Sequence, residues 1–165
     1  MAHFKTGGGL GSNQYSLRGI PKIYMSGNIP PLKTDVAWAW RQDCPPAKLA
    51  QLARHDSPQV RWTVARNLSC PINLLVLLAK DRSSRVRQHV ASNRNCPTPV
   101  LEALATDKHQ DVRLAVVNNW MCPPEIRLAL VQDPDRHIRF LARHHIMRWP
   151  GVPEHIKAAA ALIAD

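Results

Sequence analysis

Apolar residues recur along residues 44–147 with a period of 26 residues. The chain divides there into four rows that align without gaps: 44–69, 70–95, 96–121 and 122–147. Two apolar columns of this alignment are Leu52, Leu78, Leu104 and Leu130, and Val60, Val86, Val112 and Ile138. A fixed period of this length is typical of a solenoid, in which stacked units bury apolar faces that no unit can bury alone.

Each row holds two short helical patterns separated by a polar bend. In the second row, Leu75, Leu78 and Ala79 have the i, i+3, i+4 spacing of one helix face. After the bend, Val86 and Val90 are four residues apart and again share a face. Because this second segment has only about nine residues, we expect part of it to be a 3₁₀-helix. The pattern therefore predicts an all-α fold, an α-solenoid of α/3₁₀ helix pairs with period 26.

The ends of the chain depart from the repeat. Residues 34–43 look like a degenerate second helix that covers the first row, and EHIKAAAALIA after Val152-Pro153 predicts a final helix. Irregular terminal units are what a solenoid needs to end its core. Residues 1–33 are rich in glycine and show little periodicity, which predicts a flexible or extended N-terminal arm. We thus expect an arm at 1–33 and a helical-repeat domain at 34–165.

One row carries the whole pattern of the repeat. Residues 70–93, CPINLLVLLAKDRSSRVRQHVASN, fit CPxxxLxxLAxDxxxxVRxxVAxN, which resembles the variant leucine-rich repeat family. The resemblance covers roughly 44–147. It implies alternating α- and 3₁₀-helices in a right-handed superhelix, comparable to HEAT-type arrays, with a role in binding and scaffolding. Some members carry an iron–sulfur cluster on a separate N-terminal cysteine group, but this chain has no cysteine before Cys44, so no cofactor is expected.

Three positions depart from the family pattern. His55 stands in the aspartate column of the first row. In the fourth row, Arg127 replaces a leucine and His145 replaces the asparagine that the other rows hold.

The four cysteines each precede a proline, at 44–45, 70–71, 96–97 and 122–123. Neighbouring helices pack about 8–10 Å apart, whereas a disulfide needs Cα atoms within about 7 Å and a zinc ion needs all its sulfur ligands at about 2.3 Å. Cysteines on a ladder meet neither demand. We therefore expect small buried side chains at the bend where proline starts a helix, with no metal site.

The formal net charge is +10, and the sequence pI is about 10.1. The excess is spread along the chain and favours a polyanionic partner such as nucleic acid, or an acidic protein. No run of about 18 apolar residues and no apolar signal region occur, so we expect a cytoplasmic protein with no membrane partner. The pattern indicates no particular oligomeric state.

The arginine column, Arg61, Arg87, Arg113 and Arg139, has two interpretations. It could line a phosphate-binding groove. Alternatively, it pairs with the aspartate column, Asp81, Asp107 and Asp133, in a ladder of ion pairs and caps between units. We favour the ladder, and we expect the asparagine column, Asn67, Asn93 and Asn119, to satisfy backbone groups at the end of the second helix.

Variable columns of the second helix are the candidates for recognition, since such helices often line the concave side of a repeat array. They hold Trp62, Gln88, Leu114 and Phe140, and Arg66, Ser92, Asn118 and His144. We expect this face to bind a protein partner.

The alternative is nucleic-acid binding through basic side chains that follow a phosphate backbone. Those candidates are Arg54, Lys80, Arg82, Arg85, Arg94, Lys108, Arg136, Arg143 and Arg148. They could equally form a solvated basic surface that keeps the protein soluble. No nucleophile, base and orienting group can be placed together, and GGGLGS lacks the Lys-Ser/Thr of a phosphate loop, so we predict no enzyme activity.

Overall fold

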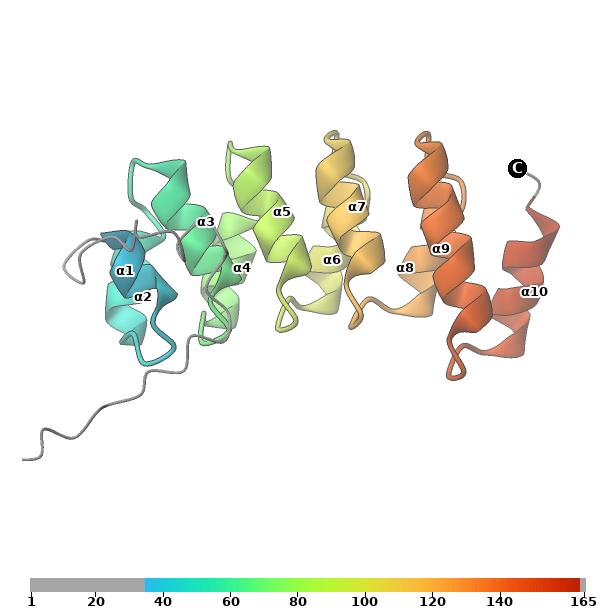
Figure 1. Ribbon diagram of the computed structural model, residues 1–165, viewed down its shortest axis with the longest axis horizontal. Coiled ribbons are helices and arrows are strands. Elements are labelled where there is room, and N and C mark those ends of the chain that lie inside the picture. Colours follow the sequence, from blue (N-terminus) through green and yellow to red (C-terminus); the bar gives the residue numbers. More distant parts are fainter. Residues whose placement is uncertain (1–34, 164–165) are drawn as a thin grey trace, which may run out of the picture. The chain divides into compact units, whose positions relative to one another are not determined.

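The computed structural model describes residues 35–163, and every regular element in that range is a helix (Figure 1). The predicted all-α class is confirmed, while the predicted arm at 1–33 lies outside the described residues. The helices are α1 Asp35–Trp40, α2 Pro46–Leu52, α3 Pro58–Arg66, α4 Ile72–Leu78, α5 Ser84–Ser92, α6 Thr98–Ala105, α7 Gln110–Asn118, α8 Pro124–Leu130, α9 Arg136–Arg148 and α10 Glu154–Leu162.

The helices after each bend lie side by side in chain order. Their first residues, Pro58, Ser84, Gln110 and Arg136, are 26 positions apart, and α3 contacts α5, α5 contacts α7, and α7 contacts α9. Figure 1 shows these second helices in one row, with α4, α6 and α8 behind them. At the two ends, α1 packs on α3 and α10 packs on α8 and α9, so both predicted terminal helices are present.

The expected 3₁₀ character of the second helices is wrong. Each of α3, α5 and α7 is an α-helix of nine residues. Bonds across three residues occur at the helix ends, as from the N–H of Val86 to the carbonyl of Ser83 and from the N–H of Asn67 to the carbonyl of Val64. Nine residues suffice for two full α-turns, and packing between neighbouring second helices stabilises what would be too short a helix in isolation.

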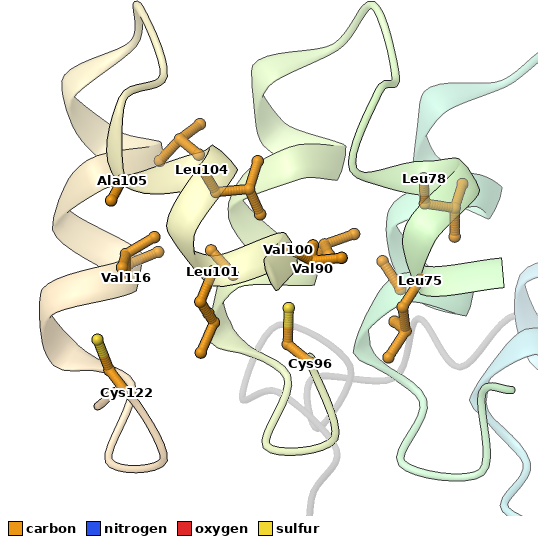
Figure 2. Packing of buried hydrophobic residues seen from close by; sticks show 14 of the residues in the cluster. Leu75, Leu78, Val90, Cys96, Val100, Leu101, Leu104, Ala105, Val116 and Cys122 are labelled. Atoms are coloured by element: carbon orange, nitrogen blue, oxygen red, sulfur yellow. The ribbon is translucent and has the colours of Figure 1, made fainter. Parts of the chain in front are cut away.

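The cysteines mark the start of each unit. Each Cys N–H donates to the carbonyl three residues before it, as from Cys96 to Asn93 at 3.0 Å, and the next proline begins a helix. The four thiols are buried and free. Figure 2 shows Cys96 and Cys122 in successive loops, each beneath its own unit's core. Burial raises the pKa of Cys70 and Cys96 to about 12, so these thiols stay protonated and act as small apolar side chains.

The core consists of the repeated apolar columns. Leu52, Leu78, Leu104 and Leu130 are at most 3% exposed, as are the valines at 86 and 112. Leucines of the first helices and valines of the second helices belong to one buried cluster, part of which Figure 2 shows. The column assignment from the sequence is therefore confirmed in the buried positions.

A buried asparagine joins each unit to the one before it. The amide of Asn93 donates to the carbonyls of Ala65 and Asn67 at 2.7 and 3.1 Å, and its side-chain oxygen accepts the N–H of Asn95 at 2.8 Å. Asn67 and Asn119 make the same bonds, 28 and 26 residues back along the chain. The expectation that this column satisfies backbone groups at the helix end is confirmed.

In the fourth unit, a different residue bonds the carbonyls of the preceding unit. His145 stands where an asparagine would reach back to the carbonyls of Val117 and Asn119. Arg127 donates to those carbonyls instead, from Nε to Val117 at 3.4 Å and from Nη2 to Asn119 at 2.7 Å. Its Nη1 donates to the carbonyl of Cys122 at 2.7 Å. Arg127 is 3% exposed and lies under the ring of Trp149. The two departures of this row from the repeat pattern therefore compensate each other.

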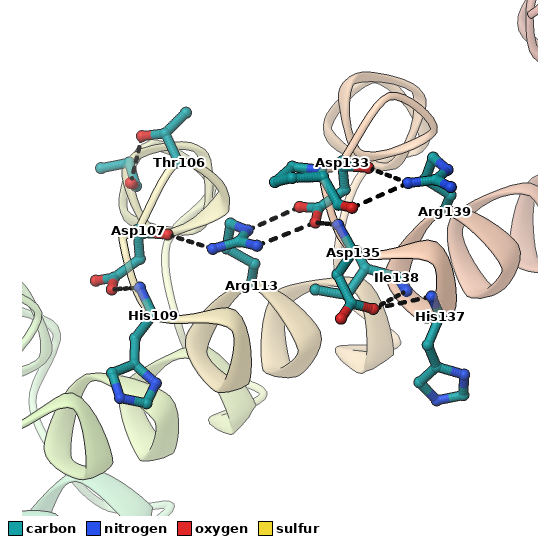
Figure 3. Close-up of polar contacts among 11 residues, drawn as sticks. Thr106, Asp107, His109, Arg113, Asp133, Asp135, His137, Ile138 and Arg139 are labelled. Carbon is teal, nitrogen blue, oxygen red and sulfur yellow. Dashed lines mark hydrogen bonds and ion pairs between the residues drawn. The ribbon is translucent and has the colours of Figure 1, made fainter.

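A ladder of arginine–aspartate pairs runs along the bends, as favoured from the sequence. Arg113 binds both carboxylate oxygens of Asp133, at 2.7 Å from Nε and 3.0 Å from Nη2 (Figure 3). The pairs Arg61–Asp81 and Arg87–Asp107 repeat this geometry, each across 20 residues. Nη1 of each arginine binds the carbonyl six residues before it, so one guanidinium fixes two bends.

Each aspartate also shapes its own bend. Asp107 accepts the N–H of His109 at 2.9 Å, which closes the turn before α7. Burial opposes the charged form, but the bonds from Arg87 and from this N–H lower the pKa of Asp107 overall. Asp81 has a lowered pKa for the same reasons, with Arg61 as its partner.

The ladder begins with a pair of reversed polarity. Position 35, which is 61 − 26, belongs to the arginine column but holds Asp35, and the aspartate column at 55 holds His55. Nε2 of His55 lies 3.4 Å from the carboxylate of Asp35. The first pair of the ladder thus keeps a contact between an acidic and a basic side chain, but the acid stands in the arginine column and the base in the aspartate column.

Leu78→Ala should lower the free energy of unfolding by about 2–5 kcal/mol, because it leaves a cavity in the core. Its neighbour Leu77 is 43% exposed, so Leu77→Ala should cost well under half as much. Urea unfolding followed by circular dichroism measures both. Equal losses in the two variants would contradict the assignment of the core face of α4.

Arg127→Leu should destabilise the protein by roughly 2–4 kcal/mol, because it leaves buried carbonyls unpaired. Adding His145→Asn should restore part of this loss, since an asparagine there can reach the same carbonyls. A double-mutant cycle in urea measures the coupling, which should be about 1 kcal/mol or more. His145→Asn on the wild-type background is the matched control, and additive losses would refute the compensation.

Asp107→Asn should weaken the acid dependence of stability. Since the folded-state pKa of Asp107 is lowered, its contribution is complete above the ordinary value of 3.8 and is lost as pH falls through the folded pKa. The wild-type free energy of unfolding should therefore fall more steeply than that of the variant between about pH 5 and about pH 2. Asp111→Asn, at an exposed carboxylate, should keep the wild-type slope; a shared slope in all three proteins would exclude the ion pair as the cause.

Candidate binding face

The predicted recognition residues lie in pairs four residues apart on the row of second helices. We call this set the second-helix face: Trp62 and Arg66 on α3, Gln88 and Ser92 on α5, Leu114 and Asn118 on α7, and Phe140 and His144 on α9. Residues at this spacing share one side of a helix. Each of the eight side chains is half-buried or exposed, whereas the column of Val60, Val86, Val112 and Ile138 on the same helices is buried. The structure therefore brings the candidates together on one surface.

The end of this face on α3 and α5 is built from stacked rings. Trp62 lies 4.8 Å from the ring of His89 at an interplanar angle of 27°, and the guanidinium of Arg85 lies 5.8 Å from the Trp62 centroid. Burial lowers the pKa of His89 to about 4, helped by Arg66 and Arg85. His89 is therefore neutral near pH 7, which permits it to stack beside two cations.

A second cation–ring contact continues this end onto α1. The guanidinium of Arg66 lies 5.0 Å from the ring centroid of Trp40. Such contacts hold a long arginine side chain in place while leaving its donors available. Trp40 and His89 were not among the predicted site residues; their columns vary between rows, and that signal could have found them.

The other end of the face carries its most exposed ring. Phe140 is 63% exposed and stacks on His144 at 5.9 Å between centroids. Between the two aromatic ends, Gln88, Ser92 and Asn118 provide amide and hydroxyl groups. Asn118 also lies 3.5 Å from Nε2 of His145. The face thus combines aromatic anchors with neutral polar groups, and its arginine is Arg66.

The predicted phosphate-contact residues do not gather on this face. Arg54, Lys80, Arg82 and Lys108 lie at the bends, and Arg85 and Arg136 lie in the first turns of second helices. Arg94 follows the C-terminal end of α5, whereas Arg85 lies at its N-terminal end. A nine-residue helix separates the two ends by about 13 Å. Arg143 donates to the carbonyl of Ile163, and Arg148 ends α9. Six of the nine basic side chains therefore lie along the bends, and Arg94, Arg143 and Arg148 lie elsewhere.

Sequence reasoning missed a second exposed surface, on the loops that precede the cysteines. We call Leu68, Arg94, Trp120 and Met121 the Cys-loop edge. Trp120 is 57% exposed and Met121 is 55% exposed. Arg94 lies 5.6 Å from the Trp120 ring, and Asn95 donates to the carbonyl of Leu68 at 2.7 Å, so adjacent loops are joined.

An open groove of about 560 Å³ lies between α6 and α8. Its walls include Glu102 and Glu125, together with Arg113, Asp107 and Asp133 of the ladder. Arg113 is bonded to Asp133, and Asp107 accepts the N–H of His109. These side chains stabilise the base of the groove.

Within 35–163, no three His, Cys, Asp or Glu side chains are placed to share a metal ion. In the same range, no helix has the length and hydropathy needed to span a bilayer.

No family model, curated protein or solved structure matches the chain. The arrangement itself can offer aromatic packing, cation–ring contacts and neutral hydrogen bonds along one face. Those are the groups that dominate protein interfaces, where Trp, Tyr and Arg carry much of the binding energy.

Proposed function

We propose that this chain is a non-catalytic binding or scaffold module that binds a protein partner on the second-helix face. We further propose that its helix pairs form a right-handed α-solenoid of the variant leucine-rich repeat kind, with a period of 26 residues. The solenoid assignment is supported by second helices that start 26 residues apart and contact their neighbours in order.

The observation that carries the proposed function is the exposed aromatic pair on α9. Phe140 is 63% exposed, although the rest of its helix contributes buried residues such as Ile138, Ala142 and Ile146 to the core. A ring that lies open on a well-packed helix is a typical anchor for a partner. Its stacking on His144 holds it in one orientation, which lowers the entropic cost of binding.

Rigidity of the scaffold supports the same role. The asparagine bonds and the arginine–aspartate ladder fix the spacing of successive second helices. Side chains in the variable columns are consequently displayed at a constant interval, so they can change without altering the frame. This separation of frame from surface suits a module that recognises a partner by shape and polar contacts.

Nucleic-acid binding remains the second candidate because the net charge is +10 and arginines lie beside tryptophan rings. Such pairs can stack on bases. Most of the basic side chains lie along the bends, but the carboxylates of Asp56, Asp111 and Asp135 lie there as well. This mixture of charges favours the protein partner, since a phosphate backbone needs one continuous basic track.

Phe140→Ala should weaken binding of a purified partner by about tenfold or more, because it removes the most exposed aromatic anchor of the face. Trp62→Ala should act similarly at the other end of the face. Val76→Ala removes an exposed apolar side chain from α4 instead and should leave the affinity unchanged. The partner would be captured by wild-type protein, purified, and titrated by isothermal calorimetry against each variant.

Fluorescence anisotropy with labelled single- and double-stranded DNA and RNA, across a salt series, tests the second candidate in the same preparations. We expect no saturable binding near physiological salt. Saturable binding that weakens steeply as salt rises, and that Arg82→Gln or Lys108→Gln reduces, would favour nucleic acid over protein. Equal partner affinity for Phe140→Ala, Trp62→Ala and Val76→Ala would exclude the second-helix face.

A further inference from the structure

The last arginine of the ladder is held like the others but has no aspartate. In the three arginine–aspartate pairs, Nη1 donates to a carbonyl six residues before the arginine. Arg139 repeats this contact, with Nη1 at 2.8 Å from the carbonyl of Asp133 and at 3.1 Å from that of Pro134. Figure 3 shows Arg113 and Arg139 in successive bends, each reaching a carbonyl of its own bend.

The other edge of the guanidinium differs. In Arg61, Arg87 and Arg113, Nε and Nη2 bind both oxygens of an aspartate 20 residues later. Twenty residues after Arg139 the chain has Ala159. Within residues 35–163, no carboxylate bonds to Arg139.

The extra turn of α9 explains why the Nε–Nη2 edge of Arg139 meets no carboxylate within residues 35–163. α9 has 13 residues where α7 has nine, and Val152-Pro153 come four residues later than the Cys-Pro period requires. The terminal helix α10 is therefore in register with Arg143, one turn further along α9. Arg143 donates to the carbonyl of Ile163, again across 20 residues. The last inter-unit contact has moved from Arg139 to Arg143.

We propose that Arg139 is a binding site for a carboxylate, supplied by an acidic side chain of a binding partner or by a small carboxylate ligand. Nη1 is already bonded to two carbonyls, so the fork is pre-oriented and its Nε–Nη2 edge can bind both oxygens at once. Arg139 is half-buried, which weakens the screening of the interaction by solvent.

The chemistry of the ligand is read from the three occupied pairs. In each of them, the same fork in the same setting holds a carboxylate with distances of 2.6 to 3.0 Å. Nearby charges agree with an anion at this position. Arg143 lies one turn away and Arg136 lies in the first turn of α9, while the closest acid of the ladder, Asp133, is paired with Arg113. The site uses no residue of the second-helix face.

An NMR titration with sodium acetate provides the test. It follows the chemical shifts of the arginine side-chain Nε–Hε signals in ¹⁵N-labelled full-length protein. Arg139 is identified by the signal that is lost in Arg139→Lys. We expect acetate to shift this signal saturably, and to leave those of Arg61, Arg87 and Arg113 unchanged because Asp81, Asp107 and Asp133 occupy them. Sodium chloride at equal ionic strength should produce no saturable shift, and Arg82, at an exposed bend, is the control for general ion effects.

Other outcomes separate the sources of the ligand or overturn the site. The Arg139 signal could already have a chemical shift like that of Arg113 before acetate is added. If Asp165→Asn then restores the response to acetate, the carboxylate comes from this chain. A carboxylate site would be refuted if acetate shifted the Arg139 signal no more than the Arg82 signal. It would also be refuted if phosphate shifted the Arg139 signal more than acetate did. Phe140→Ala should keep the acetate response, so failure of the protein-binding face and failure of this site are distinguishable.

Discussion

The structure depends on polar contacts that cross from one unit to the next at fixed sequence separation. The fork of each ladder arginine binds a carboxylate 20 residues later and a carbonyl six residues earlier. Packing of leucine and valine columns supplies most of the stabilisation, but apolar contacts tolerate sliding between helices. Bidentate bonds do not, because both oxygens must be met at once. The ladder at the bends and the asparagine bonds at the other end of each second helix therefore fix the register of neighbouring units.

The irregular positions show what this register requires. Arg127 and His145 both break the repeat, yet the carbonyls of Val117 and Asn119 remain bonded. A buried carbonyl left without a donor would cost about 1–3 kcal/mol, so one departure needs the other. The reversed pair Asp35–His55 follows the same logic at the first unit. At the far end, the extra turn of α9 gives the last contact to Arg143 and leaves the fork of Arg139 open to a ligand.

Much of the fold could be predicted from the sequence. Period, helix content, buried columns and the pairing of Asp with Arg all follow from local patterns, because a repeat presents each signal several times. The 3₁₀ assignment of the second helices was wrong, since length alone does not report the packing that stabilises a short α-helix. The second-helix face was predictable as variable columns, and Trp40 and His89 also lie in variable columns. That their rings join this face depends on contacts between different helices, which only the structure shows.

The sequence by itself determined where each unit begins, which residues are buried, and that four cysteines mark boundaries and form no cluster. Local chemistry suffices for these features: proline starts a helix, and apolar spacing defines its buried side. Only the tertiary structure decided which polar groups meet. The reach of Arg127 to the carbonyls of Val117 and Asn119 depends on how α8 packs beside the end of α7. The absence of a carboxylate beside Arg139 within residues 35–163 depends in the same way on how α10 packs on α9. Direction and distance between such atoms are set by the stacking of units, which no single row of the repeat contains.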